Sequence, residues 1–135
     1  MELRPYQLDL VNNARTALAE GNHAVCCVLG CGGGKSVIQG TIAAMATTRK
    51  NNVLFLVHRK ELCQQITGTF TACDVDFSKC SVMMVQTACR RLGKLNKPAL
   101  IIVDECHHAL SNSYLKVLKY FPGALVLGFT ATPQR

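Results

Sequence analysis

A glycine-rich stretch between two apolar segments constrains the fold of this chain more than any other feature. Residues 30–36 read Gly-Cys-Gly-Gly-Gly-Lys-Ser, after the apolar run Ala24–Leu29 and before a helical pattern. In such a turn, backbone N–H groups face inward to hold phosphate oxygens, and the helix N-terminus adds positive potential. Lys35 can then reach the β- and γ-phosphates, and the Ser36 hydroxyl can bind Mg²⁺. The nucleotide-binding residues predicted from this loop are Gly30, Gly32, Gly33, Gly34, Lys35 and Ser36.

Length and composition fit one folded domain, which we take as residues 1–135. Of the 135 residues 49% are hydrophobic, and the eight cysteines include no C-x-x-C pair, so we expect reduced, mostly buried thiols. The formal net charge of +7 suits anionic partners such as ATP and nucleic acid. No apolar run reaches the roughly 18 residues that span a bilayer, and the N-terminus has no signal-peptide pattern. We therefore expect a cytoplasmic protein without a membrane partner.

Five apolar runs alternate with amphipathic segments, and this alternation predicts an α/β fold. The runs are continuous, as in strands buried on both faces. The expected strands are Ala24–Leu29, Val53–Val57, Val82–Val85, Ala99–Val103 and Ala124–Leu127. One helix is expected to begin near Pro5, and three more are expected at Lys35–Thr48, Arg59–Phe70 and Ser113–Tyr120. The sequence therefore predicts a mostly parallel sheet with helices on both faces.

Polar residues follow the apolar runs, at the strand ends where ligands bind in an open α/β sheet. Arg59 follows the second run and Thr87 the third, and both are candidates for contacts to a phosphodiester backbone. A looser basic cluster lies just beyond, formed by Arg90, Arg91, Lys94 and Lys97. For that cluster a solvated helix face is at least as good an interpretation.

The paired carboxylates Asp104 and Glu105 end the fourth run and complement the phosphate-binding loop. Asp104 is predicted to hold Mg²⁺, partly through water, and Glu105 to orient and deprotonate the attacking water. With Lys35 they form the predicted catalytic set. The predicted cofactors are ATP and Mg²⁺. His107 and His108 follow closely, but no further ligand at zinc spacing indicates a transition-metal site.

The order and spacing of these motifs resemble the first RecA-like domain of superfamily-two helicases, in the DEAD/DEAH-box and restriction-enzyme-type group. Residues 29–36 resemble motif I, in which the first Walker glycine is often missing, as it is at Leu29. Residues 57–62 and 85–87 are similar to motifs Ia and Ib, residues 104–107 to the D-E-x-H form of motif II, and residues 130–132 to motif III. Cys106 departs from the alanine usual in that family. The resemblance covers nearly the whole chain and implies a RecA-like P-loop NTPase fold.

The resemblance also implies roles for residues outside the loop. Gln7 would contact adenine, and His107, Thr130 and Thr132 would couple the nucleotide site to movement of the domains. The family continues into a second RecA-like domain that carries an arginine finger, so the isolated chain is expected to be nearly inactive. The expected partners are that second domain and nucleic acid, with DNA favoured over RNA.

Three interpretations of function stay open at this point. The resemblance favours the ATP-binding half of a nucleic-acid-dependent ATPase or helicase that translocates or unwinds. The alternative is a non-processive, ATP-gated DNA-binding subunit of a restriction or repair complex. A small-molecule P-loop kinase is a weaker option, because it leaves the residues similar to motifs Ia and III unexplained.

Overall fold

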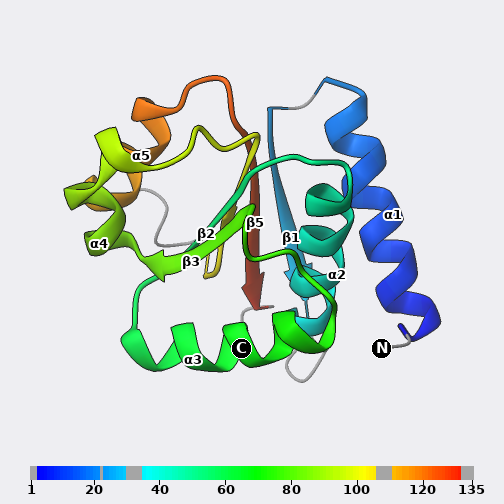
Figure 1. Cartoon of the computed structure of the whole chain (residues 1–135). Helices are drawn as coiled ribbons and strands as arrows, with labels where there is room; N and C mark the ends of the chain where they lie inside the picture. The colour runs from blue at the N-terminus through cyan, green and yellow to red at the C-terminus, as the bar shows by residue number, and fades with distance from the viewer. Residues whose placement is uncertain (1–2, 22, 30–34, 106–110, 132–135) are drawn as a thin grey trace.

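The fold is built on a five-stranded sheet in which all four strand pairings are parallel (Figure 1). The computed structural model describes residues 3–21, 23–29, 35–105 and 111–131. The strands are β1 (Ala24–Leu29), β2 (Val53–Val57), β3 (Cys80–Met84), β4 (Leu100–Val103) and β5 (Leu125–Ala131), in the spatial order β1-β5-β4-β2-β3. The predicted α/β fold with a parallel sheet is confirmed.

Helices cover both faces of the sheet. They are α1 (Pro5–Ala19), α2 (Lys35–Thr48), α3 (Lys60–Ala72), α4 (Val85–Arg90) and α5 (Asn112–Tyr120), with the short 3₁₀ turn η1 (Leu92–Lys94) after α4. Because successive strand side chains point to opposite faces, β2 supplies two cores. Phe55 packs in the core under α1, α2 and α3, whereas Leu54 and Leu56 pack in the core under α4 and α5. Burial on both faces explains why the strands are continuous apolar runs.

The structure corrects the expected boundary between the third strand and the segment that follows. The run Val82–Val85 was expected to be a strand, but β3 spans Cys80–Met84 and Val85 is the first residue of α4. Val85 is buried in the core as a helical residue, so an apolar side chain there carries no strand signal of its own. Thr87, expected at the end of the third strand, therefore lies within the helix α4.

The last strand also differs from expectation, because β5 runs to Ala131 where the pattern ended at Leu127. Gly128 interrupts the apolar run, yet it stays in the ladder opposite Cys26 of β1. Thr130, expected beyond the strand end, pairs in register with Val28 inside the sheet.

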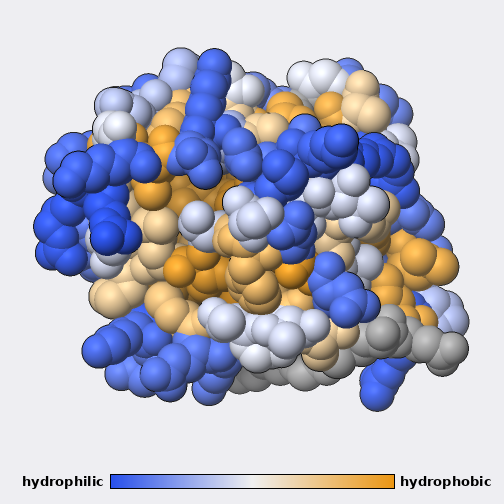
Figure 2. Space-filling view, viewed as in Figure 1, coloured by the Kyte–Doolittle hydropathy of each residue, from blue (hydrophilic) through white to orange (hydrophobic). Residues whose placement is uncertain are grey.

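The surface on the side of β3 is mixed. In the space-filling view, hydrophobic residues gather in the middle of the face, around β3, and hydrophilic residues predominate over α4 and α5 (Figure 2). This agrees with the position of β3 as an outer strand, in which Val82, Met83 and Met84 are only half-buried. Within the described ranges, no helix is long and apolar enough to cross a bilayer.

Candidate active site

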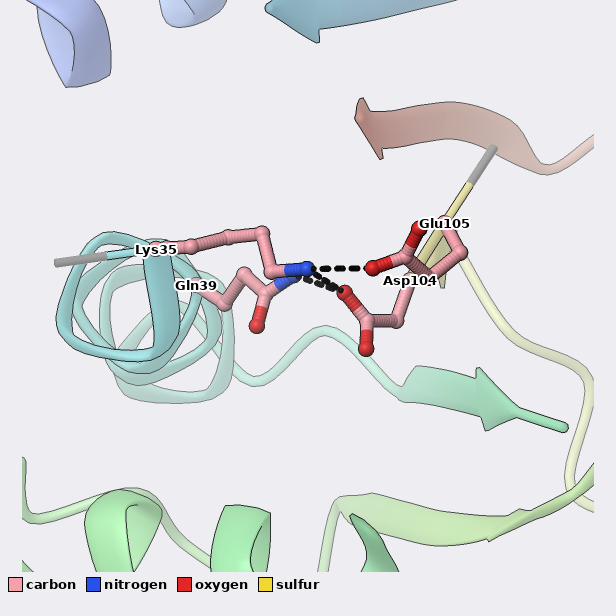
Figure 3. A network of polar contacts seen from close by, with 4 residues as sticks. All are labelled: Lys35, Gln39, Asp104 and Glu105. Atoms are coloured by element: carbon pink, nitrogen blue, oxygen red, sulfur yellow. Dashed lines mark hydrogen bonds and ion pairs between the residues drawn. The ribbon is translucent and has the colours of Figure 1, made fainter. Parts of the chain in front are cut away.

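The three predicted catalytic side chains meet at the carboxyl end of the sheet. Lys35 is the first residue of α2, and Asp104 and Glu105 directly follow β4. The Lys35 Nζ atom lies 2.8 Å from Asp104 Oδ1 and 3.0 Å from Glu105 Oε1 (Figure 3). Residues 70 positions apart in the chain are thereby brought within hydrogen-bonding distance.

The ion pair compensates a carboxylate that is almost entirely buried. The side chain of Asp104 is only 4% exposed, and a buried charge is costly unless a partner neutralises it. Burial of Lys35 on its own lowers the pKa of the ammonium, but its hydrogen bonds to Asp104 and Glu105 and their negative charges outweigh this effect. The net result is a Lys35 pKa above its usual value, so the lysine carries its positive charge at neutral pH.

The backbone at Glu105 explains how two adjacent carboxylates reach one ammonium group. Glu105 has a φ of 58°, in the left-handed region that non-glycine residues seldom adopt. Consecutive side chains in an extended strand point to opposite faces. The change of backbone direction after Asp104 instead lets both carboxylates approach Lys35.

A further polar residue, Gln39, belongs to this site and was not among the predicted residues. It lies one turn beyond Lys35 on α2, is 0% exposed, and its Nε2 donates a hydrogen bond of 3.1 Å to Asp104 Oδ1. Both α2 side chains extend toward the carboxylates in Figure 3. One signal was available in the sequence, because Gln39 is polar between the apolar positions Ile38 and Ile42 of the buried helix face.

The oxygen donors at the site suit a hard divalent cation such as Mg²⁺. Asp104 and Glu105 offer carboxylates, and the Ser36 hydroxyl belongs to the first turn of α2, beside Lys35. Mg²⁺ prefers oxygen ligands and is usually held by one or two carboxylates together with substrate phosphates. Asp104 already needs a cationic neighbour in the structure, so the residues fit the predicted metal.

Gln7 lies at the start of α1, where its side chain has a structural partner. Its Oε1 accepts a hydrogen bond of 2.9 Å from the backbone N–H of Arg4, and the residue is buried. This contact with the backbone of the N-cap residue fixes the Gln7 side chain near the helix N-terminus. The adenine contact remains a prediction.

The other predicted site residues lie on separate elements or outside the described residues. Arg59 is exposed at the residue preceding α3, Thr87 lies in α4, and Thr130 lies in β5. Six predicted positions lie outside the described residues: Gly30, Gly32, Gly33, Gly34, His107 and Thr132.

Three features of the structure define the class of RecA-like P-loop domains. They are the parallel sheet, the lysine that opens the helix after β1, and the carboxylate pair after β4. The chain belongs to the family described as type III restriction enzyme, res subunit, whose model matches residues 1–90 and 76–135. This membership confirms the resemblance to the first RecA-like domain of superfamily-two helicases of the restriction-enzyme type.

Two curated relatives illustrate this membership. The chain is 45% identical over 104 residues to a "51.5 kDa protein" of a Lactococcus phage (isolate 7-9), an alignment covering 77% of this chain and 23% of that protein. It is 34% identical over 163 aligned positions to the "Putative ATP-dependent helicase IRC3" of Saccharomyces cerevisiae, covering 98% of this chain and 24% of the relative. The chain thus spans about a quarter of the length of these relatives.

Solved structures confirm the fold. The type ISP restriction-modification enzyme LlaGI, solved with a DNA substrate mimic, superposes with a TM-score of 0.78 at 18% identity, over 100% of this chain and 18% of that one. The Hef helicase domain of Pyrococcus furiosus superposes with a TM-score of 0.71 at 22% identity, over 100% of this chain and 36% of that one.

Proposed function

We propose that this chain is the ATP-binding half of a nucleic-acid-dependent ATPase or helicase, which couples ATP hydrolysis to translocation or unwinding. The observation that carries the proposal is the meeting of Lys35, Asp104 and Glu105 at the carboxyl end of the sheet. Phosphoryl transfer needs a cation for the β- and γ-phosphates and carboxylates for Mg²⁺ and the attacking water. These three residues supply that set within one contact network.

Each residue has a distinct role in the proposed reaction. Lys35 leaves the carboxylates and turns to the phosphates, where its positive charge stabilises the developing negative charge. Asp104 and Ser36 would hold Mg²⁺, which would supply charge neutralisation at the phosphates. Glu105 orients the attacking water and accepts its proton.

Nucleic acid is the proposed partner, with DNA favoured over RNA. The relative IRC3 is named as an ATP-dependent helicase, and the LlaGI structure contains a DNA substrate mimic. On this chain, Arg59 is exposed two residues after the carboxyl end of β2 and is the proposed contact to a phosphate backbone, together with Thr87. A second RecA-like domain is proposed as the other partner, and a cytoplasmic location stays a prediction.

An alternative is a subunit of a restriction or repair complex in which ATP gates DNA binding without processive unwinding. The chain belongs to the family of the res subunits, and this membership favours keeping the ATP-gated subunit as a candidate. The two candidates differ in one measurement on a protein that also includes the proposed second RecA-like domain. The measurement is the displacement of a third DNA strand annealed far from the entry site. Repeated ATP-driven displacement supports translocation, and ATP-dependent binding without displacement supports the gated subunit.

Nucleotide binding by the chain itself is the first test. Titration calorimetry with ADP and Mg²⁺ should give binding that falls about 10- to 100-fold in Lys35→Ala, since a charge-assisted contact to phosphate is lost. Lys60→Ala is a matched control, because Lys60 is exposed and also opens a helix after a parallel strand. Equal affinities for wild type and Lys35→Ala would remove this site from nucleotide binding.

A further inference from the structure

We propose that Gln39 is a positioning residue for Asp104, which holds the carboxylate in place for Mg²⁺ when Lys35 turns to the phosphates. This inference rests on the nucleotide-binding function proposed above. Its basis is the hydrogen bond of 3.1 Å from Gln39 Nε2 to Asp104 Oδ1, between two residues that are both almost fully buried.

In the proposed reaction Lys35 contacts first Asp104 and then the phosphates. Asp104 therefore needs a second hydrogen-bond donor. In the structure its ammonium is 2.8 Å from Asp104 Oδ1, the same oxygen that Gln39 contacts. When the ammonium binds phosphate, Asp104 loses that contact but keeps the one from Gln39. The backbone N–H of Asp104 also remains anchored, to the Leu56 carbonyl at 3.2 Å.

Gln39 is suited to this task because it approaches from a rigid part of α2. It lies on the buried face of the helix, where Ile38, Ile42 and Ala43 belong to the core. An amide carries no charge, so it can donate to the carboxylate without competing with Mg²⁺ for it. The side chain therefore fixes the carboxylate and leaves its negative charge available to the metal.

The cost of keeping an amide in this position indicates a specific role. Among the described residues the buried Gln39 Oε1 atom has no hydrogen-bond partner. An unpaired buried polar atom destabilises a fold, and an apolar side chain of the same size would avoid this. The fold is thus locally less stable at Gln39, the residue that supports the proposed metal-binding carboxylate of Asp104.

The test compares nucleotide affinity with and without Mg²⁺. Gln39→Met keeps the length and volume of the side chain and removes the donor, and Gln65→Met is the matched control at an exposed position of α3. A fluorescent ADP analogue reports affinity in EDTA and in Mg²⁺, and electron paramagnetic resonance of Mn²⁺ reports bound metal directly. In Gln39→Met we expect unchanged affinity in EDTA and about a tenfold smaller gain on adding the metal.

A double variant separates action through Asp104 from a packing effect. In an Asp104→Asn background, adding Gln39→Met should change the metal-dependent gain by less than about twofold, because the positioned group is already absent. Should Gln39→Met fail to fold, Gln39→Asn replaces it, since an amide shortened by about 1.5 Å no longer reaches the carboxylate.

The outcomes distinguish this inference from the function on which it rests. A wild-type chain that binds no nucleotide would overturn the proposed function. Wild-type binding with a full metal-dependent gain in Gln39→Met would overturn only the role of Gln39. An equal loss in EDTA and in Mg²⁺ would also overturn it, because Gln39 would then act on the site as a whole.

Discussion

At the scale of single residues, Glu105 combines an unusual backbone conformation with a contact to Lys35. Its carboxylate has the proposed role of activating water, which an amide cannot perform because it does not accept the proton. In a longer protein that includes the downstream domain, Glu105→Gln should lower turnover by at least about 100-fold and leave ATP bound. Phosphate release and filter binding measure the two effects, with Glu61→Gln as an exposed control. Parallel loss of binding and turnover would contradict the proposed role.

Tyr114 is a buried residue whose ionisation should make the fold sensitive to alkali. Burial, followed by the charges of Asp104 and Glu105, raises the pKa of its hydroxyl to about 12 from an ordinary 10. Between pH 10 and 12 the unfolded chain releases this proton and the native chain retains it, so stability falls as the pH rises. The contribution of Tyr114 to this fall is on the order of 2 kcal/mol.

Tyr114→Phe isolates this contribution. Among the described residues the Tyr114 hydroxyl has no hydrogen-bond partner, so at pH 8 the variant should be at least as stable as wild type. From pH 10 to 12 the free energy of unfolding in urea should fall less steeply in the variant. Cys80, whose pKa is raised to about 12 by burial, should keep some alkaline loss in both proteins. Parallel curves for the two proteins would exclude Tyr114 as the titrating group.

At the scale of elements, α2 and α3 approach each other closely at Gly40. A Cβ atom there would lie 2.7 Å from Cys73 Sγ and 3.3 Å from Phe70 Cδ1. Overpacking costs about 1–3 kcal/mol and exceeds the helix-propensity gain of about 1 kcal/mol. Gly40→Ala should therefore destabilise the chain in urea unfolding.

Gly68 on α3 provides the matched control for Gly40. No atom lies within 4 Å of a Cβ placed there, so Gly68→Ala should stabilise by about 0.5–1 kcal/mol. Cys73→Ala removes the nearest atom and should reduce the cost of Gly40→Ala. Stabilisation by both glycine substitutions would show that the helices separate easily.

The sequence predicted most elements because their signals are local. Continuous apolar runs located β1 and β2 with the bounds that the structure has, and the 3.6-residue period located α2. The boundary at Val85 was wrong because one apolar run combined the end of β3 with the first buried residue of α4. Strand pairing and helix packing decide that boundary, and a local pattern does not contain them.

Only part of the site could be predicted, because only some of its residues have a local signal in the sequence. Lys35, Asp104 and Glu105 stand in recognisable motifs, so their convergence could be expected from the positions of their strands. Gln39 carries no motif, and its contact with Asp104 joins residues 65 positions apart. Its proposed role depends on the distance between Gln39 and Asp104, which only the folded chain defines.

At the scale of the whole molecule, the resemblance to superfamily-two helicases implies an arginine finger on a second RecA-like domain. An arginine finger supplied from elsewhere is worth about 10³–10⁵ in rate in P-loop enzymes. We predict that the 135-residue chain binds ATP and hydrolyses it very slowly. A longer protein with the downstream domain should be faster by orders of magnitude and respond to nucleic acid. A stimulated rate in the chain alone would instead indicate a self-contained ATPase.

Nucleic-acid binding by the longer protein tests the exposed position of Arg59. Arg59→Ala should weaken single-strand binding about equally for all sequences and reduce the salt slope by about one, because one phosphate contact is lost. Arg15→Ala is a control on α1, outside the carboxyl end of the sheet. Loss confined to particular sequences would assign Arg59 to base recognition.

The strand order has a consequence for how the protein is made on the ribosome. In the described part of the chain β1 pairs only with β5, a strand synthesised about 100 residues later. At about 5–20 residues per second, the nascent β1 waits roughly 5–20 s for its neighbour. Until β5 emerges, β1 therefore has no partner strand among the described residues. During that interval the unpaired β1 is an edge on which chaperones or other nascent chains can act.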